Sequence, residues 1–178
     1  NKSFIIKIIV LCLVTIKVSA IEKVILFGDS LMAGYGLPKE QHLSVVLQNS
    51  LELEGHKIEI VNGSVSGSTS AGGLNIAEWT LSENDIDFMI LCLGANDMLR
   101  GINPKETKNN LEEIIKIAKN KNIKIIIAGM IAPTSYGFEY KKSFDKIFSD
   151  LSKKHKLQLI PFLLEGVAQK PEFNLSDG

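Results

Sequence analysis

Residues 88–97 read FMILCLGAND, and this stretch indicates the class of fold. Its first six residues are apolar without interruption, which is typical of a strand buried on both faces of a sheet. Gly94 ends the run, and the polar residues Asn96 and Asp97 follow. In an open α/β sheet, ligands bind beyond the carboxyl ends of the strands. The stretch therefore predicts a central strand that leads directly into a site.

Similar segments lie on both sides of it. Apolar runs predict further strands at residues 24–27, 58–61, 123–128 and 157–160. Helical periodicity predicts helices at residues 43–53, 74–81, 104–118 and 144–151, with a Gly/Ser-rich loop over residues 62–73. Strands that alternate with helices form parallel sheets covered on both faces. We therefore expect one α/β domain over residues 21–178, a flavodoxin-like three-layer sandwich with a five-stranded parallel sheet.

The amino-terminal segment differs from the rest of the chain. Lys2 and Lys7 flank an apolar stretch, and small residues follow at 18–20 (VSA), where a signal peptidase cleaves. This pattern predicts a signal peptide over residues 1–20 and export to a periplasm or to the outside of the cell. A membrane anchor is the alternative, but the apolar run is too short to span a bilayer and Lys17 interrupts its far end. We expect no stable membrane anchor.

Composition excludes several classes of function. The chain has 20 basic and 20 acidic residues, so no overall charge favours nucleic acid. No phosphate-binding GxxxxGK[ST] motif and no His/Cys cluster with metal-ligand spacing is present in the sequence, so we expect no cofactor and no metal. Cys92 lies within the central apolar run, and we interpret it as an inert core residue.

Three polar segments follow the first three strands and are expected to meet at one edge. Ser30 follows the first strand, where a serine at a strand-to-helix turn is exposed and has backbone N–H groups near it. Asn96 carries an amide that can donate to an oxyanion, and Gly67 lets a backbone N–H approach a ligand. Each has a simpler reading: Ser30 or Asp29 as a helix cap, Asn96 as a turn residue and Gly67 as one loop glycine among several.

The motifs resemble those of the SGNH (GDSL) hydrolases. Residues 27–31 (FGDSL) resemble the first block of that family, and residues 62–67 (NGSVSG) resemble the second. Residues 94–101 (GANDMLRG) resemble the third, in the form found in periplasmic acyl-CoA thioesterases, lysophospholipases and arylesterases. Residues 161–171 and the terminal Asp177-Gly178 continue the likeness, which covers essentially the whole chain after residue 20.

The resemblance implies a role for each motif. Ser30 would be the nucleophile, and the oxyanion hole would comprise the N–H groups of Ser30 and Gly67 and the amide of Asn96. Asp177 would orient a catalytic histidine. Asp29, Leu31 and Tyr136 are expected near the substrate, although Tyr136 and Phe138 are equally consistent with packing on the next helix. The substrate would be a small acyl ester or thioester, such as a lysophospholipid, and the protein a monomer.

The fourth block of the family reads Asp-x-x-His, and the sequence ends at Asp177-Gly178. We therefore expect the histidine, and the final helix of the fold, beyond Gly178. The 178 residues alone are expected to be poorly active and prone to aggregate. Nothing in the sequence around His42, His56 or His155 indicates that one of them replaces the catalytic histidine.

Three other functions remain open from the sequence. A carbohydrate O-deacetylase would use the same machinery with a shorter, more polar pocket. A non-catalytic binding domain would need no histidine, but it would also have no need to retain Ser30, Gly67, Asn96 and Asp177 together. A flavodoxin-like nucleotide-binding protein would suit the Gly/Ser loop, but it gives residues 94–97 no role.

Overall fold

The computed structural model describes residues 21–82 and 85–173. Five parallel strands form one sheet in the order β2-β1-β3-β4-β5. Their bounds are β1 Glu22–Gly28, β2 Ile58–Asn62, β3 Phe88–Cys92, β4 Lys124–Ala128 and β5 Gln158–Ile160. This is the strand order of flavodoxin-like folds, and it confirms the predicted sheet.

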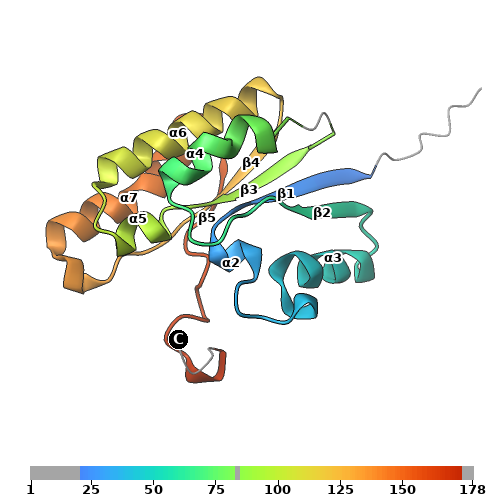
Figure 1. The fold of residues 1–178 in the computed structure, drawn as a ribbon, viewed down its shortest axis with the longest axis horizontal. Coiled ribbons are helices and arrows are strands. Elements are labelled where there is room, and N and C mark those ends of the chain that lie inside the picture. Colours follow the sequence, from blue (N-terminus) through green and yellow to red (C-terminus); the bar gives the residue numbers. More distant parts are fainter. Residues whose placement is uncertain (1–20, 83–84, 174–178) are drawn as a thin grey trace, which may run out of the picture.

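Helices lie on both faces of the sheet (Figure 1). One face carries α4 (Ser70–Thr80), α6 (Pro104–Asn120) and α7 (Phe138–His155), while α3 (Leu43–Leu53) and the short α2 (Ser30–Ala33) lie on the other. A second short helix, α5 (Ala95–Leu99), follows β3. Single 3-10 turns occupy Lys39–Gln41 (η1), Thr134–Tyr136 (η2) and Pro171–Phe173 (η3).

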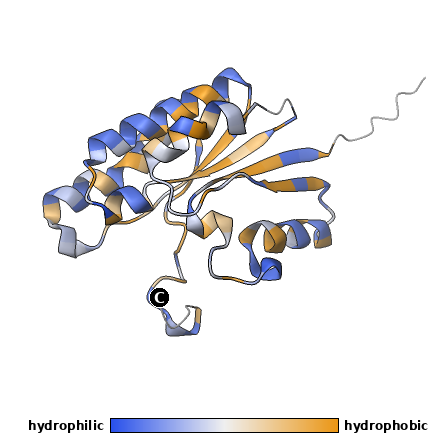
Figure 2. Ribbon diagram, viewed as in Figure 1, coloured by the Kyte–Doolittle hydropathy of each residue, from blue (hydrophilic) through white to orange (hydrophobic). Residues whose placement is uncertain are grey.

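The core lies between the sheet and the three-helix layer. Figure 2 shows hydrophobic strands at the centre and hydrophilic residues along the outer side of α6. The buried side of α6 consists of Leu111, Ile114, Ile115 and Ala118, as its periodicity predicts. Phe144 and Phe148 of α7 complete this layer with an edge-to-face ring contact, their centroids 5.7 Å apart.

Local structure departs from the sequence-based expectation at α4. The helix begins at Ser70 rather than at residue 74, so the Gly/Ser loop is shorter than predicted. Thr69 caps the helix by accepting a hydrogen bond from the Gly72 N–H at 3.1 Å. Gly73 sits directly against the Leu93 side chain, where a Cβ would have no room. Gly73 therefore lies inside the helix because close packing on the sheet outweighs its low helix propensity.

Two further features concern the termini and the short helices. The four-residue α2 and five-residue α5 were not separately predicted, because they are too short to show helical periodicity. Among the helices of residues 21–82 and 85–173, none is long and apolar enough to cross a membrane. The predicted signal peptide, residues 1–20, lies outside the described residues.

Candidate active site

The turn after β1 presents Ser30. It is the first residue of α2 and is half-buried, and Asp29 caps the helix by accepting a hydrogen bond from the Leu31 N–H at 3.1 Å. Gly28 is required immediately before this turn, since a Cβ there would lie 2.6 Å from the carbonyl oxygen of Cys92. The end of β1 therefore passes close to the end of β3, and Ser30 is held at the carboxyl edge of the sheet.

The loop after β2 is attached to this turn. The Val65 N–H donates to the Gly28 carbonyl at 3.0 Å, and the Asn62 side chain donates to the Met32 carbonyl at 3.2 Å. Gly67 follows with φ of +77°, a conformation that residues with a side chain rarely adopt. The loop therefore brings an exposed glycine to the same edge as Ser30.

Asn96, in α5 after β3, connects the other two segments. Its Nδ2 donates to Asp29 Oδ2 at 3.3 Å and to the Ser68 carbonyl at 3.1 Å. One residue from the third segment thus contacts the residue before Ser30 and the residue after Gly67. The three polar segments meet, as expected for loops at neighbouring strand ends.

Two backbone donors at this edge remain available. Within the described part of the chain, the N–H groups of Ser30 and Gly67 donate no hydrogen bond to a protein acceptor. The N–H of Ser30 lies in the first turn of α2, where helix geometry provides no intrahelical acceptor. Both groups can therefore donate to a ligand oxygen.

The electrostatics of the site centre on Asp29, which is only 1% exposed. Burial raises the pKa of its carboxyl group, hydrogen bonds from Leu31 and Asn96 oppose the shift, and the charge of Asp97 adds to it. Burial, and then the charge of Asp29, raise the pKa of the Cys92 thiol to about 12. The thiol is therefore not a nucleophile at neutral pH, and the prediction that Cys92 lies in the core is confirmed.

A cavity of about 560 Å³ opens at the same edge, beyond the ends of β4 and β5. Most of its lining is apolar, with Lys141, Thr134 and Gln169 as polar members. The apolar lining comprises Met98, Met130, Ile131, Ala132, Pro133, Phe162, Leu164 and Ala168. The cavity reaches α5 at Met98, whereas Ser30, Gly67 and Asn96 are not among its lining residues.

The remaining predicted substrate and triad residues lie in different surroundings. Leu31 is 37% exposed, directly after Ser30. Tyr136 stacks on Tyr140 of α7 with ring centroids 5.4 Å apart, so its observed contact is with the following helix. Asp177 lies outside the described residues. Roles for Leu31, Tyr136 and Asp177 in catalysis stay predictions.

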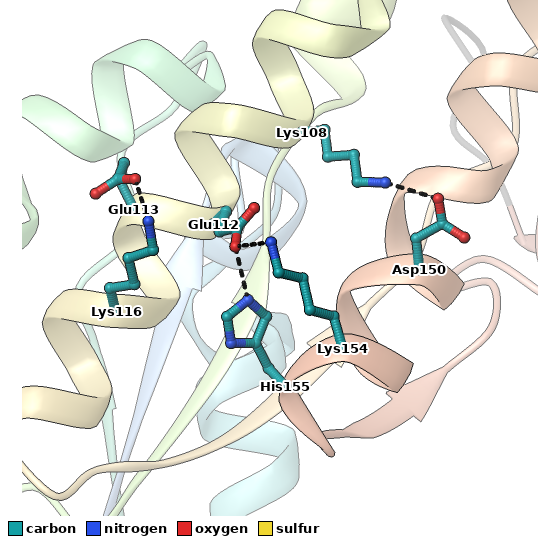
Figure 3. Close-up of polar contacts among 7 residues, drawn as sticks. All are labelled: Lys108, Glu112, Glu113, Lys116, Asp150, Lys154 and His155. Carbon is teal, nitrogen blue, oxygen red and sulfur yellow. Dashed lines mark hydrogen bonds and ion pairs between the residues drawn. The ribbon is translucent and has the colours of Figure 1, made fainter.

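The three histidines make other contacts. His42 lies just before α3 with Nε2 3.0 Å from the Leu37 carbonyl oxygen, and His56 is 3.8 Å from Glu54. His155, at the end of α7, lies 3.1 Å from Glu112 of α6, beside the Glu112–Lys154 ion pair (Figure 3). His56 and His155 precede β2 and β5, at the edge of the sheet opposite Ser30.

Sequence reasoning assigned no role to Asp97, Ser70 or Arg100. Asp97 is fully buried and accepts hydrogen bonds from the Ser70 N–H at 2.7 Å and from the Ser70 hydroxyl. Arg100 donates to the Gly67 carbonyl at 3.1 Å. Asp97 and Arg100 stand inside the quoted GANDMLRG motif, but a sequence does not show which loop a side chain will reach.

Comparison with known proteins agrees with this geometry. The model of the GDSL-like lipase/acylhydrolase family matches residues 26–178. The chain belongs to this family. The resemblance stated from the motifs is therefore confirmed, and the protein is a carboxylic ester or thioester hydrolase.

Several relatives of the acylhydrolase are similar over most of its length. It is 36% identical over 159 residues to an arylesterase of Vibrio mimicus, which covers 89% of this chain and 80% of the relative. It is 32% identical over 168 residues to thioesterase 1/protease 1/lysophospholipase L1 of Escherichia coli K12, covering 94% and 79%. The crystal structure of AlinE4, an SGNH-hydrolase family esterase, matches with a TM-score of 0.85 at 37% identity, covering 88% of this chain and 84% of that one.

Proposed function

We propose that this hydrolase acts through an acyl-enzyme on Ser30. The Ser30 oxygen attacks the acyl carbonyl, and the hydroxyl proton passes to the histidine that the family pattern places after Asp177. The N–H groups of Ser30 and Gly67 and the amide of Asn96 stabilise the oxyanion. The histidine then protonates the leaving alcohol or thiol, and water releases the acid in a second attack.

The observation that carries the proposal is the position of the Asn96 amide. Its Nδ2 contacts both Asp29, which precedes Ser30, and Ser68, which follows Gly67. The amide therefore lies between the two segments that supply the backbone donors. Fixing the amide on the Ser68 carbonyl before the reaction limits the reorganisation needed when charge develops, and such a donor is worth more than a mobile one.

The amide of Asn96 reaches the oxyanion by exchanging one of its hydrogen bonds. Both of its contacts are made by Nδ2, and the contact with Asp29 is the longer at 3.3 Å against 3.1 Å for Ser68. We propose that the hydrogen bond from Asn96 to Asp29 is the one that breaks. The Ser68 contact then keeps the amide oriented while its other N–H turns to the oxyanion.

The apolar cavity beside α5 supports a substrate with an acyl chain rather than an acetyl group. Its volume of about 560 Å³ lies within the range of small-molecule sites, and its lining is largely hydrophobic. Lysophospholipids and acyl thioesters both fit this description. The pattern of residues 1–20 supports export to a periplasm or to the outside of the cell.

The test is hydrolysis of p-nitrophenyl esters of rising chain length by the protein expressed from its complete reading frame. The expected result is faster turnover of octanoate than of acetate, and a loss of about 10⁶-fold in kcat for Ser30→Ala. Hydrolysis that persists in Ser30→Ala would contradict the nucleophile. Strong preference for acetate would instead favour the O-deacetylase.

A further inference from the structure

The loop that carries Gly67 is held by three side chains of one short helix. In α5, Asn96 contacts Ser68 and Asp97 contacts Ser70. Arg100, the C-terminal cap of the helix, contacts Gly67. These contacts reach three of the four residues of the segment 67–70. This segment, here called the oxyanion loop, is therefore attached to α5 in addition to its own turn, which the Ser68 N–H closes by donating to the Val65 carbonyl at 3.1 Å.

Asp97 is the anchor of these contacts. It is fully buried, and it receives hydrogen bonds from the Ser70 N–H, the Ser70 hydroxyl and the Thr107 hydroxyl, the last at 3.1 Å. Asn110 of α6 donates to the Ser70 hydroxyl at 3.0 Å. A buried carboxylate is tolerated where donors surround it, and these donors connect the oxyanion loop to the long helix α6.

Arg100 acts at the other end of the oxyanion loop. It is exposed, and its guanidinium donates to the Gly67 carbonyl at 3.1 Å. Gly67 has positive φ, and a Cβ built on it would meet no atom within 4 Å. The Ser68 N–H donates to the Val65 carbonyl at 3.1 Å and closes a turn over Gly67, and the Arg100 contact adds a second restraint on the backbone of this otherwise free glycine.

We propose that Asp97 and Arg100 are positioning residues that hold the oxyanion loop so that the Gly67 N–H faces the substrate carbonyl. This inference rests on the proposed function of Ser30 and Gly67. Neither residue touches the reacting atoms in this account. Each acts through the backbone of residues 67–70.

The kinetic consequence is specific to the transition state. A donor displaced by a fraction of an ångström still permits substrate to bind, but it stabilises the oxyanion less, so kcat falls and KM does not change. Arg100→Met removes the donor while keeping an apolar chain of similar length, and a loss of about tenfold in kcat is expected. Arg100→Lys restores a donor and is expected to recover part of the loss.

The experiment measures kcat and KM on p-nitrophenyl octanoate, the inhibition constant of a matched trifluoromethyl ketone, and the melting temperature. The ketone adds reversibly to the serine and forms an oxyanion, so its inhibition constant reports on the oxyanion hole. In Arg100→Met the inhibition constant should rise in proportion to the loss of kcat, with the melting temperature unchanged. Lys108→Gln is the matched control, because Lys108 is a partly exposed cation of the following helix α6 that pairs with Asp150 at 2.7 Å and not with the oxyanion loop (Figure 3).

Asp97→Asn tests the buried contact between Asp97 and Ser70 and is expected to lower kcat by about 100-fold. The inhibition constant of the ketone should rise by a similar factor. Wild-type kcat and ketone inhibition in Arg100→Met would overturn the inference, whether or not Asp97→Asn folds. A wild-type enzyme with no Ser30-dependent hydrolysis would overturn the proposed function as well. An active wild type with an unaffected Arg100→Met overturns the positioning role alone.

Discussion

The two edges of the sheet each have a cavity and charged side chains, but they differ in what is buried. Beyond the carboxyl ends lies the 560 Å³ cavity, and at the amino ends lies one of about 460 Å³ whose lining includes Phe88, Lys124 and His155. The buried polar or charged residues of the described part of the chain are Asp29, Ser70, Asp97 and Thr107. All of them belong to the hydrogen-bond network at the carboxyl edge.

The amino edge is organised differently. Its ion pairs include Glu112 with Lys154, whose side chain is 60% exposed. Exposed pairs of this kind contribute little to stability, whereas burying a polar group is costly unless its partners are in place. The difference teaches that a cavity alone does not identify a site. The carboxyl edge differs from the amino edge in having buried polar side chains that hold its loops in place.

Among the variants that compare the two edges, the largest effect is expected from Asn96→Ala. Loss of one oxyanion donor is expected to lower kcat by about 10²–10³-fold, with KM little changed. The counterpart at the amino edge is Glu112→Gln, which weakens the contacts with Lys154 and His155 and should leave kcat unchanged. Steady-state kinetics on one ester measures both, and equal losses in the two variants would remove the distinction between the edges.

A pair of glycines sharpens the comparison. Gly67 at the carboxyl edge and Gly55 near the amino edge have φ of +77° and +84°, and a Cβ on either meets no atom within 4 Å. Alanine at each position should therefore cost a similar 1–2 kcal/mol, roughly, in the free energy of unfolding. Only Gly67→Ala is expected to lower kcat as well, by about tenfold. Denaturant unfolding and kinetics on both variants check this, and a similar kcat loss in Gly55→Ala would refute it.

Asp29→Asn probes the buried carboxyl group beside Ser30. The pKa of Asp29 is raised, so the folded protein binds this proton more tightly than the unfolded chain does. Protonated Asp29 therefore contributes to the free energy of unfolding at low pH, and this contribution is lost as the pH rises through the raised pKa. The melting temperature of Asp29→Asn relative to wild type should therefore increase as the pH rises above the ordinary carboxyl pKa and through the raised pKa of Asp29.

Two ionisable groups near Asp29 bear on its titration. Asp97 adds a like charge, and the Cys92 thiol is neutral over the range because its pKa is about 12. The variant with asparagine retains an acceptor for the Leu31 N–H. A melting-temperature difference that is flat with pH would show that Asp29 does not titrate with a raised pKa.

The smallest effect is expected at Cys92. Its side chain is buried behind the site and its thiol pKa is about 12, so the folded protein without residues 1–20, which contain Cys12, should not react with a thiol reagent at pH 8. Absorbance with a disulfide reagent should stay flat until denaturant is added and then report the thiol. Rapid reaction of the folded protein at Cys92 would mean that the ends of β1 and β3 open to solvent.

The sequence predicted the sheet well because its strands are continuous apolar runs. Helices α3 and α6 were also predicted within a few residues, since their apolar positions recur with a helical period. Ser30, Gly67 and Asn96 were identified from the strand-end rule together with the family motifs. Their meeting through Asn96 follows from neighbouring strands in the parallel sheet.

Other features could not be predicted from local pattern. The start of α4 at Ser70 depends on Thr69 and on the packing of Gly73 against Leu93, which are tertiary contacts. The hydrogen bonds of Asp97 and Arg100 with residues 67–70 connect distant positions of the sequence. Asp97 and Ser70 are 27 residues apart, and Arg100 and Gly67 are 33 residues apart. A single sequence shows residue types but not which distant loop each side chain reaches.

The most direct test of the account is covalent labelling of the nucleophile. The protein expressed from its complete reading frame is treated with a fluorophosphonate ester, digested, and examined by mass spectrometry. The account predicts one adduct, on the Ser30 hydroxyl, formed in step with the loss of esterase activity and absent from Ser30→Ala. An adduct on another residue, or esterase activity that survives full labelling of Ser30, would contradict it.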